Sequence, residues 1–226
     1  MIMSFMKKEK NNSKKRHLLM VSLNLLRRQY SLCGGKENKV KIIGITGKSG
    51  SGKSTLTKLL AKEMKSDCID IDQIGHEATY NKQIAKRLCE VWGQEILGND
   101  GKIDRKKLGK IVFSNKEKMD ILTDITWDYM QEKLDNVLQK HLQDTIILEW
   151  ALLPISKYWE KCDIKILMKA EDEKRKIQVM QRDKISEEYF LIRDANSINY
   201  EIYEFDYIFD NNYKPEIMEK LISRIK

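Results

Sequence analysis

The sequence predicts a three-layer α/β fold in which helices cover both faces of a five-stranded parallel sheet. Three observations lead to this prediction. Short apolar runs recur along the chain and are separated by segments with helical periodicity. A glycine-rich octapeptide at 47–54 lies between the first of these runs and the first helical pattern. Two long polar stretches, 80–142 and 171–204, have helical patterns and contribute no strand.

The predicted strands are short and apolar, as is typical of buried parallel strands. They span residues 40–46, 68–72, 144–150, 162–168 and 205–209. The segment 55–64, which follows the octapeptide, predicts a helix packed on the sheet because its apolar side chains share one face. These side chains are Leu56, Leu59, Leu60 and Met64.

The octapeptide GKSGSGKS fits the phosphate-binding loop pattern G-x-x-x-x-G-K-[ST]. Its glycines let successive backbone N–H groups turn inward as an anion nest, and the following helix N-terminus adds partial positive charge. Lys53 would reach the β- and γ-phosphates of a nucleoside triphosphate, and the Ser54 hydroxyl would ligate Mg²⁺. The predicted ATP-binding residues are Gly47, Lys48, Ser49, Gly50, Ser51, Gly52, Lys53, Ser54 and Thr55. A flexible Gly/Ser loop is the alternative, and the flanking strand and helix argue against it.

The 226-residue chain has a formal net charge of +8, and this charge belongs to its first segment. Residues 1–39 contain ten basic and two acidic residues, which leaves 32 of each in residues 40–226. We therefore expect a basic N-terminal extension, disordered or loosely helical, ahead of an electrically neutral body. The extension could touch nucleic acid or anionic lipid, although a solvated tail is the simpler interpretation.

The composition also predicts where the protein works. No apolar run approaches the roughly 20 residues that span a bilayer. The four cysteines are scattered without a C-x-x-C pair, which argues against a zinc site or a disulfide framework. We expect a cytoplasmic protein without a membrane partner or a specific nucleic-acid partner.

Two carboxylates, Asp70 and Asp72, follow the second predicted strand. Ligands of open parallel sheets bind beyond the carboxyl ends of the strands, so both are expected near the phosphates. Strand periodicity places them on the same side of the sheet. One would accept the proton of an attacking hydroxyl while the other orients Mg²⁺ or a water. The alternative is that Asp72 caps the helix predicted to follow it.

Several blocks share the pattern of one kinase family. They are GITGKSGSGKST, CIDIDQIGH, the segment GKIDRKKLGKIVF at 101–113 and DYIFDNN at 206–212. Together they resemble the dephospho-coenzyme A kinases over residues 40–226, and the 101–113 block is the most specific match. The resemblance implies a P-loop kinase fold. It also implies transfer of the γ-phosphate of ATP to the ribose 3′-hydroxyl of dephospho-coenzyme A, the last step of coenzyme A biosynthesis.

The resemblance also implies roles for particular residues. Asp72 corresponds to the general base, and Arg182 to a lid arginine that closes on the phosphates. With Lys53 they form the predicted catalytic set. The stretch 80–142 corresponds to an acceptor-binding insertion and 171–204 to a lid. A monomer or weak homo-oligomer is expected.

The chain departs from the family pattern mostly on the acceptor side. Lys48 stands where glycine is usual. Gln178 stands where an arginine is frequent, and Arg175 lies one turn earlier. Residues 151–155 lack the glutamate of the family's P-L-L-x-E block, although Glu149 lies two residues before it. Trp127 and the following aspartate replace a His-Pro pair.

The remaining candidates are substrate-binding and lid residues, namely Asp70, His76 and Arg105 for substrate and Arg175, Arg182 and Arg193 for the lid. Three of them have structural alternatives. His76 would pack the following helix, and Arg105 would pair with Asp100 or Asp104. Arg193 would lie on a solvated helix face, which is the interpretation that the sequence favours.

Other functions fit the same loop. A nucleoside or nucleotide kinase of the same fold is one alternative, although the loop lacks a threonine-rich end and the chain lacks an Asp-Ser-Tyr-type motif. A degenerate NTP-binding regulatory protein is a second, and the intact Lys53, Ser54 and Asp72 argue against it. A nucleic-acid binder is a weaker third, because the body is neutral.

Overall fold

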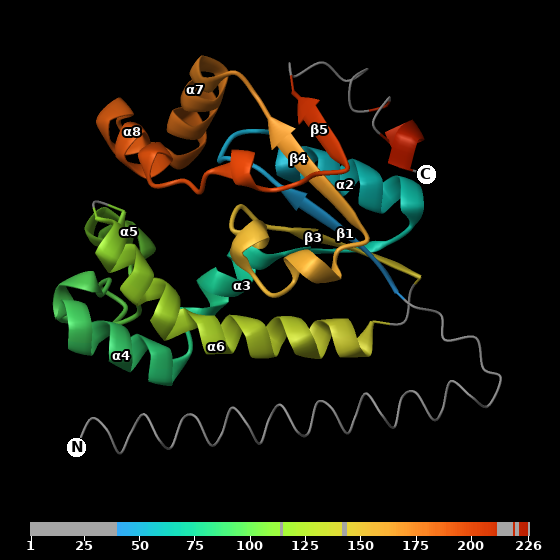
Figure 1. Cartoon of the computed structure of the whole chain (residues 1–226). Helices are drawn as coiled ribbons and strands as arrows, with labels where there is room; N and C mark the ends of the chain where they lie inside the picture. Colours follow the sequence, from blue (N-terminus) through green and yellow to red (C-terminus); the bar gives the residue numbers. More distant parts are fainter. Residues whose placement is uncertain (1–39, 114, 142–143, 212–218, 220–221, 226) are drawn as a thin grey trace. The chain divides into compact units, whose positions relative to one another are not determined.

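Among the described residues, five parallel strands form one sheet in the computed structural model of the protein (Figure 1). The strands are β1 (Lys41–Thr46), β2 (Asp67–Asp70), β3 (Thr145–Glu149), β4 (Ile164–Lys169) and β5 (Tyr207–Asp210), in the order β2-β3-β1-β4-β5. All neighbours pair in parallel, which confirms the predicted sheet. The structure describes residues 40–113, 115–141, 144–211, 219 and 222–225, all within the unit Val40–Lys226. The expectation for residues 1–39 lies outside them.

Helices connect the strands and fill both long polar stretches. They are α2 (Lys53–Met64), α3 (Ile71–Ala78), α4 (Lys82–Trp92), α5 (Arg105–Val112), α6 (Lys116–Lys140), α7 (Asp172–Asp183) and α8 (Glu187–Ala195). Short 3-10 turns are η1 (Gln94–Ile96), η2 (Leu153–Ile155), η3 (Trp159–Lys161) and η4 (Tyr200–Ile202). In the part of the chain that the structure describes, no helix has both the length and the apolar character needed to cross a bilayer.

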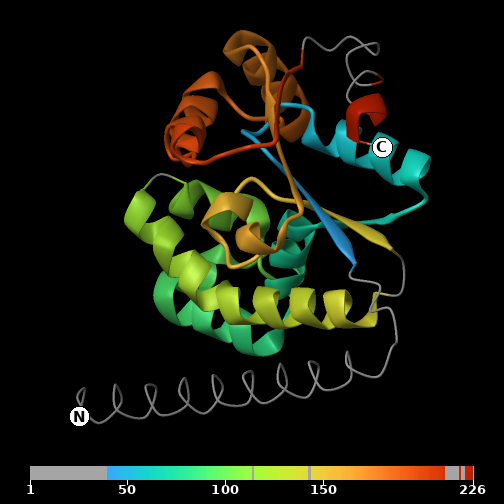
Figure 2. The same ribbon diagram turned by 45° about the vertical axis from the view of Figure 1, so that its right-hand side comes forward.

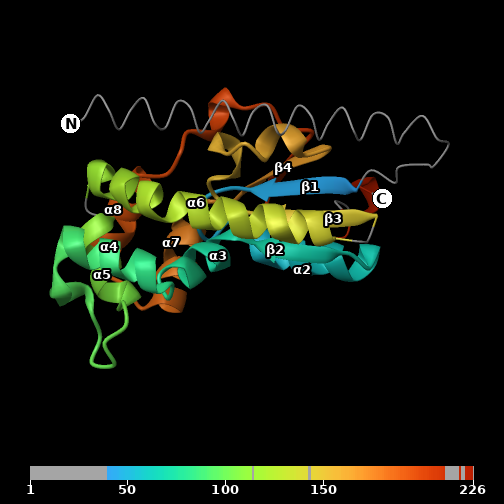
Figure 3. The same ribbon diagram turned by 90° about the horizontal axis from the view of Figure 1, so that it is seen from below.

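The two faces of the sheet carry different cores because strand side chains alternate in direction. On one face, Ile43 packs with Leu56 and Leu60 of α2. On the other face, Leu148 packs with Leu134 of α6, and Figure 2 shows the sheet between these two helices. A third cluster joins α4 and α5 to the first half of α6, which extends beyond the sheet (Figure 3).

The buried face of α2 is narrower than the sequence suggests. Leu56 and Leu60 are fully buried, whereas the Leu59 side chain is 36% exposed. The prediction that Leu59 shares the buried face is wrong. Leu59 lies three residues after Leu56, at the edge of the apolar stripe, and the sheet does not reach it.

The second strand is shorter than predicted, and this changes the setting of the two aspartates. β2 ends at Asp70, and α3 begins at Ile71, whose side chain is buried. Asp72 therefore lies in the first turn of a helix, and the prediction that strand periodicity places it on the same side of the sheet as Asp70 was wrong. Asp70, not Asp72, caps α3, because its Oδ1 accepts a hydrogen bond from the Gln73 backbone N–H at 3.2 Å.

The substitutions Leu60→Ala and Leu59→Ala test this account of α2. Truncating the fully buried Leu60 should lower the free energy of unfolding by about 2–5 kcal/mol, because it leaves a cavity against the sheet. Truncating the exposed neighbour Leu59 should cost less than about 1 kcal/mol. Urea unfolding followed by circular dichroism measures both, and equal losses would contradict the assigned helix face.

Candidate active site

The phosphate-binding loop connects β1 to α2 and turns through three glycines with left-handed backbone. Their φ angles are +145° at Gly47, +78° at Gly50 and +92° at Gly52. A Cβ atom at Gly47 would lie 2.2 Å from the carbonyl oxygen of Met168 in β4. Glycine is therefore required there both by the backbone angle and by the close approach of the neighbouring strand.

Three carbonyl groups of the loop accept hydrogen bonds from side chains that approach from outside it. Lys53 Nζ donates to the Lys48 carbonyl at 3.1 Å, and Arg175 Nη1 donates to the Ser49 carbonyl at 2.9 Å. The buried Asn211 donates to the Ser51 carbonyl at 3.0 Å. The Ser51 N–H also donates to the Lys48 carbonyl at 3.2 Å, so these bonds together fix the turn that a phosphate-binding nest requires.

Lys53 and Asp72 form the charged centre of the site. Lys53 is the first residue of α2, and its side chain is buried. Burial lowers the pKa of its ammonium group, while the Asp72 and Glu149 carboxylates act in the opposite sense. The Asp72 side chain is open to solvent on one side, yet enough protein surrounds the carboxyl group for desolvation to raise its pKa to about 6, against the opposing effect of Lys53. Asp72 is thus a carboxylate of unusually high basicity beside a buried cation.

Glu149 lies at the carboxyl end of β3 and holds the Ser54 hydroxyl. Ser54 Oγ donates to Glu149 Oε1 at 2.6 Å, and the Glu149 side chain is buried. Sheet register sets this carboxylate directly opposite Asp70 of β2 and Ile45 of β1. The sequence placed Glu149 near the site without giving it a role. The Ser54 hydroxyl and the Glu149 carboxylate are oxygen ligands of the kind that Mg²⁺ prefers. Among the described residues, no group of three or more Asp, Glu, His or Cys side chains could hold a metal ion.

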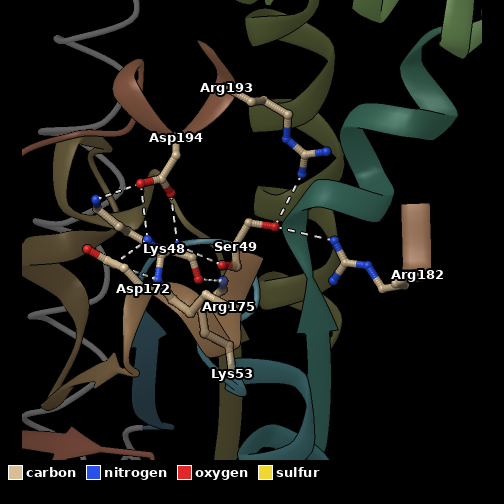
Figure 4. Close-up of polar contacts among 8 residues, drawn as sticks. All are labelled: Lys48, Ser49, Lys53, Asp172, Arg175, Arg182, Arg193 and Asp194. Atoms are coloured by element: carbon tan, nitrogen blue, oxygen red, sulfur yellow. Dashed lines mark hydrogen bonds and ion pairs between the residues drawn. The ribbon is translucent and has the colours of Figure 1, made fainter. Parts of the chain in front are cut away.

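Two arginines of the polar stretch 171–204 converge on one hydroxyl of the loop (Figure 4). Arg182 Nη2 and Arg193 Nη2 donate to Ser49 Oγ at 3.3 and 3.2 Å. Asp183 binds both guanidinium groups, at 2.7 Å from Arg182 Nε and 2.8 Å from Arg193 Nη1. The favoured interpretation of Arg193 as part of a solvated helix face was wrong, because α8 turns this residue toward the loop.

Arg175 lies beneath this pair and is 1% exposed. Its guanidinium donates to Asp172 and Asp194 as well as to the Ser49 carbonyl. Its guanidinium N–H groups therefore all donate to other groups of the protein. Arg175 joins α7 to the loop, and the structure does not turn it toward the nest in the way that it turns Arg182 and Arg193.

The predicted substrate residues His76 and Arg105 contact each other. Arg105 Nη2 lies against His76 Nε2, and His76 Nδ1 is 3.3 Å from Gln73 Oε1. Burial, followed by the Arg105 charge, lowers the pKa of His76, so the ring is a neutral acceptor for the guanidinium. The suggested partners Asp100 and Asp104 instead accept backbone N–H groups. Arg105 thus contacts α3, the helix that carries Asp72.

Sequence reasoning missed three polar residues that shape the site. Asp183 and Asp194 hold the arginines, and Asn211 holds the loop. Asn211 falls within the DYIFDNN block, so that motif was a usable signal. Trp150 belongs to a buried core cluster, and Trp92, Phe113 and Trp127 are partly buried and pack against the clusters.

Comparison with known proteins identifies the family. The model of the family described as dephospho-CoA kinase matches residues 41–214 of this chain. The chain belongs to the dephospho-CoA kinase family. A dephospho-CoA kinase of Fusobacterium nucleatum is 32% identical over 187 residues, which cover 82% of this chain and 96% of that protein. One from Dehalococcoides mccartyi is 40% identical over 107 residues, 47% of this chain and 54% of that protein.

Solved structures give the same fold. A crystal structure of a Thermus thermophilus protein has a TM-score of 0.68 and 26% identity, covering 82% of this chain and 96% of that one. A dephospho-CoA kinase structure from Campylobacter jejuni has a TM-score of 0.52 at 24% identity and shows the fold alone, with 82% and 95% of the two chains covered. These likenesses confirm the predicted P-loop kinase fold of this dephospho-CoA kinase family member.

The substitution Lys53→Met tests the coupling at the charged centre. It should raise the Asp72 pKa above its value of about 6, because the ammonium group favours the carboxylate form. Carbon-13 NMR titration of labelled aspartates measures the change. Lys58→Met, which removes an exposed lysine of the same helix, is the matched control and should leave that pKa in place. An Asp72 pKa that fell or stayed constant on Lys53→Met would contradict the coupling.

Proposed function

We propose that this chain phosphorylates the ribose 3′-hydroxyl of dephospho-CoA with ATP as donor, and that Asp72 is the general base. The observation that carries the assignment of the base is a carboxylate with a pKa raised to about 6, beside Lys53 and at the edge of the phosphate-binding loop. An ordinary aspartate is too weak a base to accept a hydroxyl proton efficiently near neutral pH, and a higher pKa brings proton affinity closer to what the reaction needs.

In the proposed transfer, the 3′-hydroxyl oxygen forms a bond to the γ-phosphorus of ATP while its proton moves to an Asp72 carboxylate oxygen. The bond between the γ-phosphorus and the bridging oxygen breaks, and ADP leaves with the electron pair. The transition state is loose, so the protein contributes mainly positioning and charge neutralisation.

Charge neutralisation falls to Lys53, Arg182 and Arg193. Lys53 follows the loop, and both arginines already meet at Ser49 Oγ, so all three cations border the nest. We assign residues 47–55 to ATP binding and the stretch 171–204 to a lid that carries the arginines. Ser54 and Glu149 would hold Mg²⁺, which supplies Lewis-acid stabilisation of the phosphate charge when bound.

We assign the acceptor to the side of the site formed by 80–142 and α3. Arg105 and His76 would contact the substrate there, together with the Asp70 oxygen that does not cap α3. The stretch 151–155 lacks the glutamate of the family pattern, and Glu149 is bonded to Ser54 instead of filling that role. Neither a nucleoside kinase nor a regulatory protein gains support from the comparisons. A monomeric or weakly associating state and a cytoplasmic location remain predictions.

An acceptor comparison tests the proposed function. The purified protein with ATP and Mg²⁺ is offered dephospho-CoA, uridine, cytidine or shikimate, and ADP release is followed with a coupled assay. We expect turnover with dephospho-CoA alone, and a product that carries phosphate at the 3′ position by phosphorus NMR. Release of ADP with another acceptor but not with dephospho-CoA would refute the proposal.

The variant Asp72→Asn tests the base. It should lower kcat by on the order of 10²–10⁴-fold, the usual contribution of general-base catalysis. ATP affinity measured by titration calorimetry should change little, because the loop is intact. Glu77→Gln, an exposed carboxylate on the same helix, is the control and should keep its rate. A rate for Asp72→Asn close to that of the parent would reassign the base.

The pH dependence of kcat/KM tests the same residue in another way. The base must be ionised in the free enzyme, so kcat/KM should fall as the pH is lowered through about 6. Below that pH, a plot of log kcat/KM against pH should have a slope of about 1, as expected for one ionising group. The Asp72→Asn variant should lack this fall in kcat/KM. A profile that breaks near pH 4, the ordinary range for aspartate, would mean that a less perturbed carboxylate is responsible.

A further inference from the structure

The phosphate-binding loop is joined to α8 by a charge pair at the position where the family pattern has glycine. Lys48 Nζ lies 2.9 Å from Asp194 Oδ2, and the two side chains are 37% and 17% exposed (Figure 4). We propose that Lys48 and Asp194 are positioning residues that keep the α7–α8 segment docked on the loop before nucleotide binds. The proposal rests on the proposed function only in treating that segment as the lid.

Asp194 is fixed from below by the buried Arg175. Arg175 Nη1 and Nη2 donate to the two Asp194 oxygens at 2.8 and 3.0 Å, and Asp172 holds the other side of the guanidinium at 2.7 Å. Burial alone would raise the Asp194 pKa, but hydrogen bonds from Arg175 and Lys48 lower it below the ordinary value. The carboxylate is therefore ionised and oriented, and it presents a fixed anion to Lys48.

The same two helices approach the loop backbone closely. A Cβ at Gly50 would lie 2.9 Å from Val179 Cγ2 and 3.0 Å from the Arg175 carbonyl oxygen, so α7 rests on the loop at this glycine. Arg175 also donates to the Ser49 carbonyl at 2.9 Å. Docking thus combines a tight backbone contact, a buried arginine and the Lys48 charge pair. Of these, the charge pair is the most exposed to solvent.

Lys48 connects this docking contact to the reactive groups. Its carbonyl accepts the Lys53 Nζ hydrogen bond at 3.1 Å, so Lys48 binds α8 with its side chain and Lys53 with its backbone. Asp194 is also the neighbour of Arg193, which reaches Ser49 Oγ. The Asp194–Lys48 contact therefore keeps Arg193 directed at the loop in the absence of nucleotide.

Hydrogen exchange of the ligand-free protein tests the proposal independently of any activity. Lys48→Met keeps the length of the side chain and removes its charge. We expect the amides of α8 to exchange about fivefold faster in this variant, the factor for losing a partly exposed ion pair. Lys48→Arg should restore most of the protection. Lys174→Met, which breaks the exposed Lys174–Glu171 pair without touching α8 or the loop, is the matched control and should leave the exchange of the α8 amides unchanged.

A second variant shows whether Asp194 is the partner. Asp194→Asn should also increase exchange, and more strongly, because Arg175 loses an anion too. Adding Lys48→Met to Asp194→Asn should then cause little further change. If Lys48→Met has its full effect in the absence of the Asp194 charge, the pair is not the docking contact.

Steady-state kinetics separate positioning from direct phosphate contact. If Lys48 acts by docking, Lys48→Met should raise KM for ATP about fivefold and leave kcat within about twofold, since bound phosphates then hold the lid arginines. If Lys48 instead contacts the transferred phosphate, kcat should fall by more than tenfold while the exchange of ligand-free α8 is unchanged, and the proposal is overturned. An enzyme with a different acceptor would still show the exchange result, so failure of the proposed function is distinguishable.

Discussion

The carbonyl groups of the phosphate-binding loop set the geometry on which the rest of the active site depends. A backbone that turns its N–H groups toward an anion must turn its carbonyls toward protein, and each carbonyl then needs a donor. Here the donors come from three separate places in the chain: the Lys53 ammonium, the Arg175 guanidinium and the Asn211 amide. The loop is thus shaped by α2, by α7 and by the residue after β5. Parts of the chain that are distant in sequence become necessary for one turn of backbone.

Sheet topology places the acidic groups beside this loop. The central strand β1 leads into the loop, and its neighbour β3 ends in Glu149 at the same level as Asp70 of β2. Asp72 then follows in the first turn of α3. Desolvation by burial is the main cause that raises the Asp72 pKa; the buried Lys53 limits the rise, and the Asp70 and Glu149 carboxylates add to it. The raised pKa of Asp72 is therefore a property of strand order, burial and one cation together.

The sequence was sufficient for the sheet and the loop because both depend on local patterns. Apolar runs mark strands, and glycine spacing marks a turn with positive φ angles. It was not sufficient at Asp72, because an apolar residue such as Ile71 fits equally well inside a short strand or on the buried face of a helix. It also failed at Arg193, whose partner Ser49 lies 144 residues earlier in the chain. Local periodicity carries no information about such a contact, and an arginine on a polar helix looks solvated until its partner is known.

The pairing of Asp183 with two arginines bears on how nucleotide would bind. Asp183 accepts hydrogen bonds from both Arg182 and Arg193, the two guanidinium groups that would bind phosphate oxygens in the proposed function. Under that proposal, nucleotide binding would exchange one anion for another at these arginines. Since few free counterions are displaced in such an exchange, we expect ATP affinity to depend only weakly on ionic strength. A steep dependence would mean that the arginines leave Asp183 before the triphosphate reaches them.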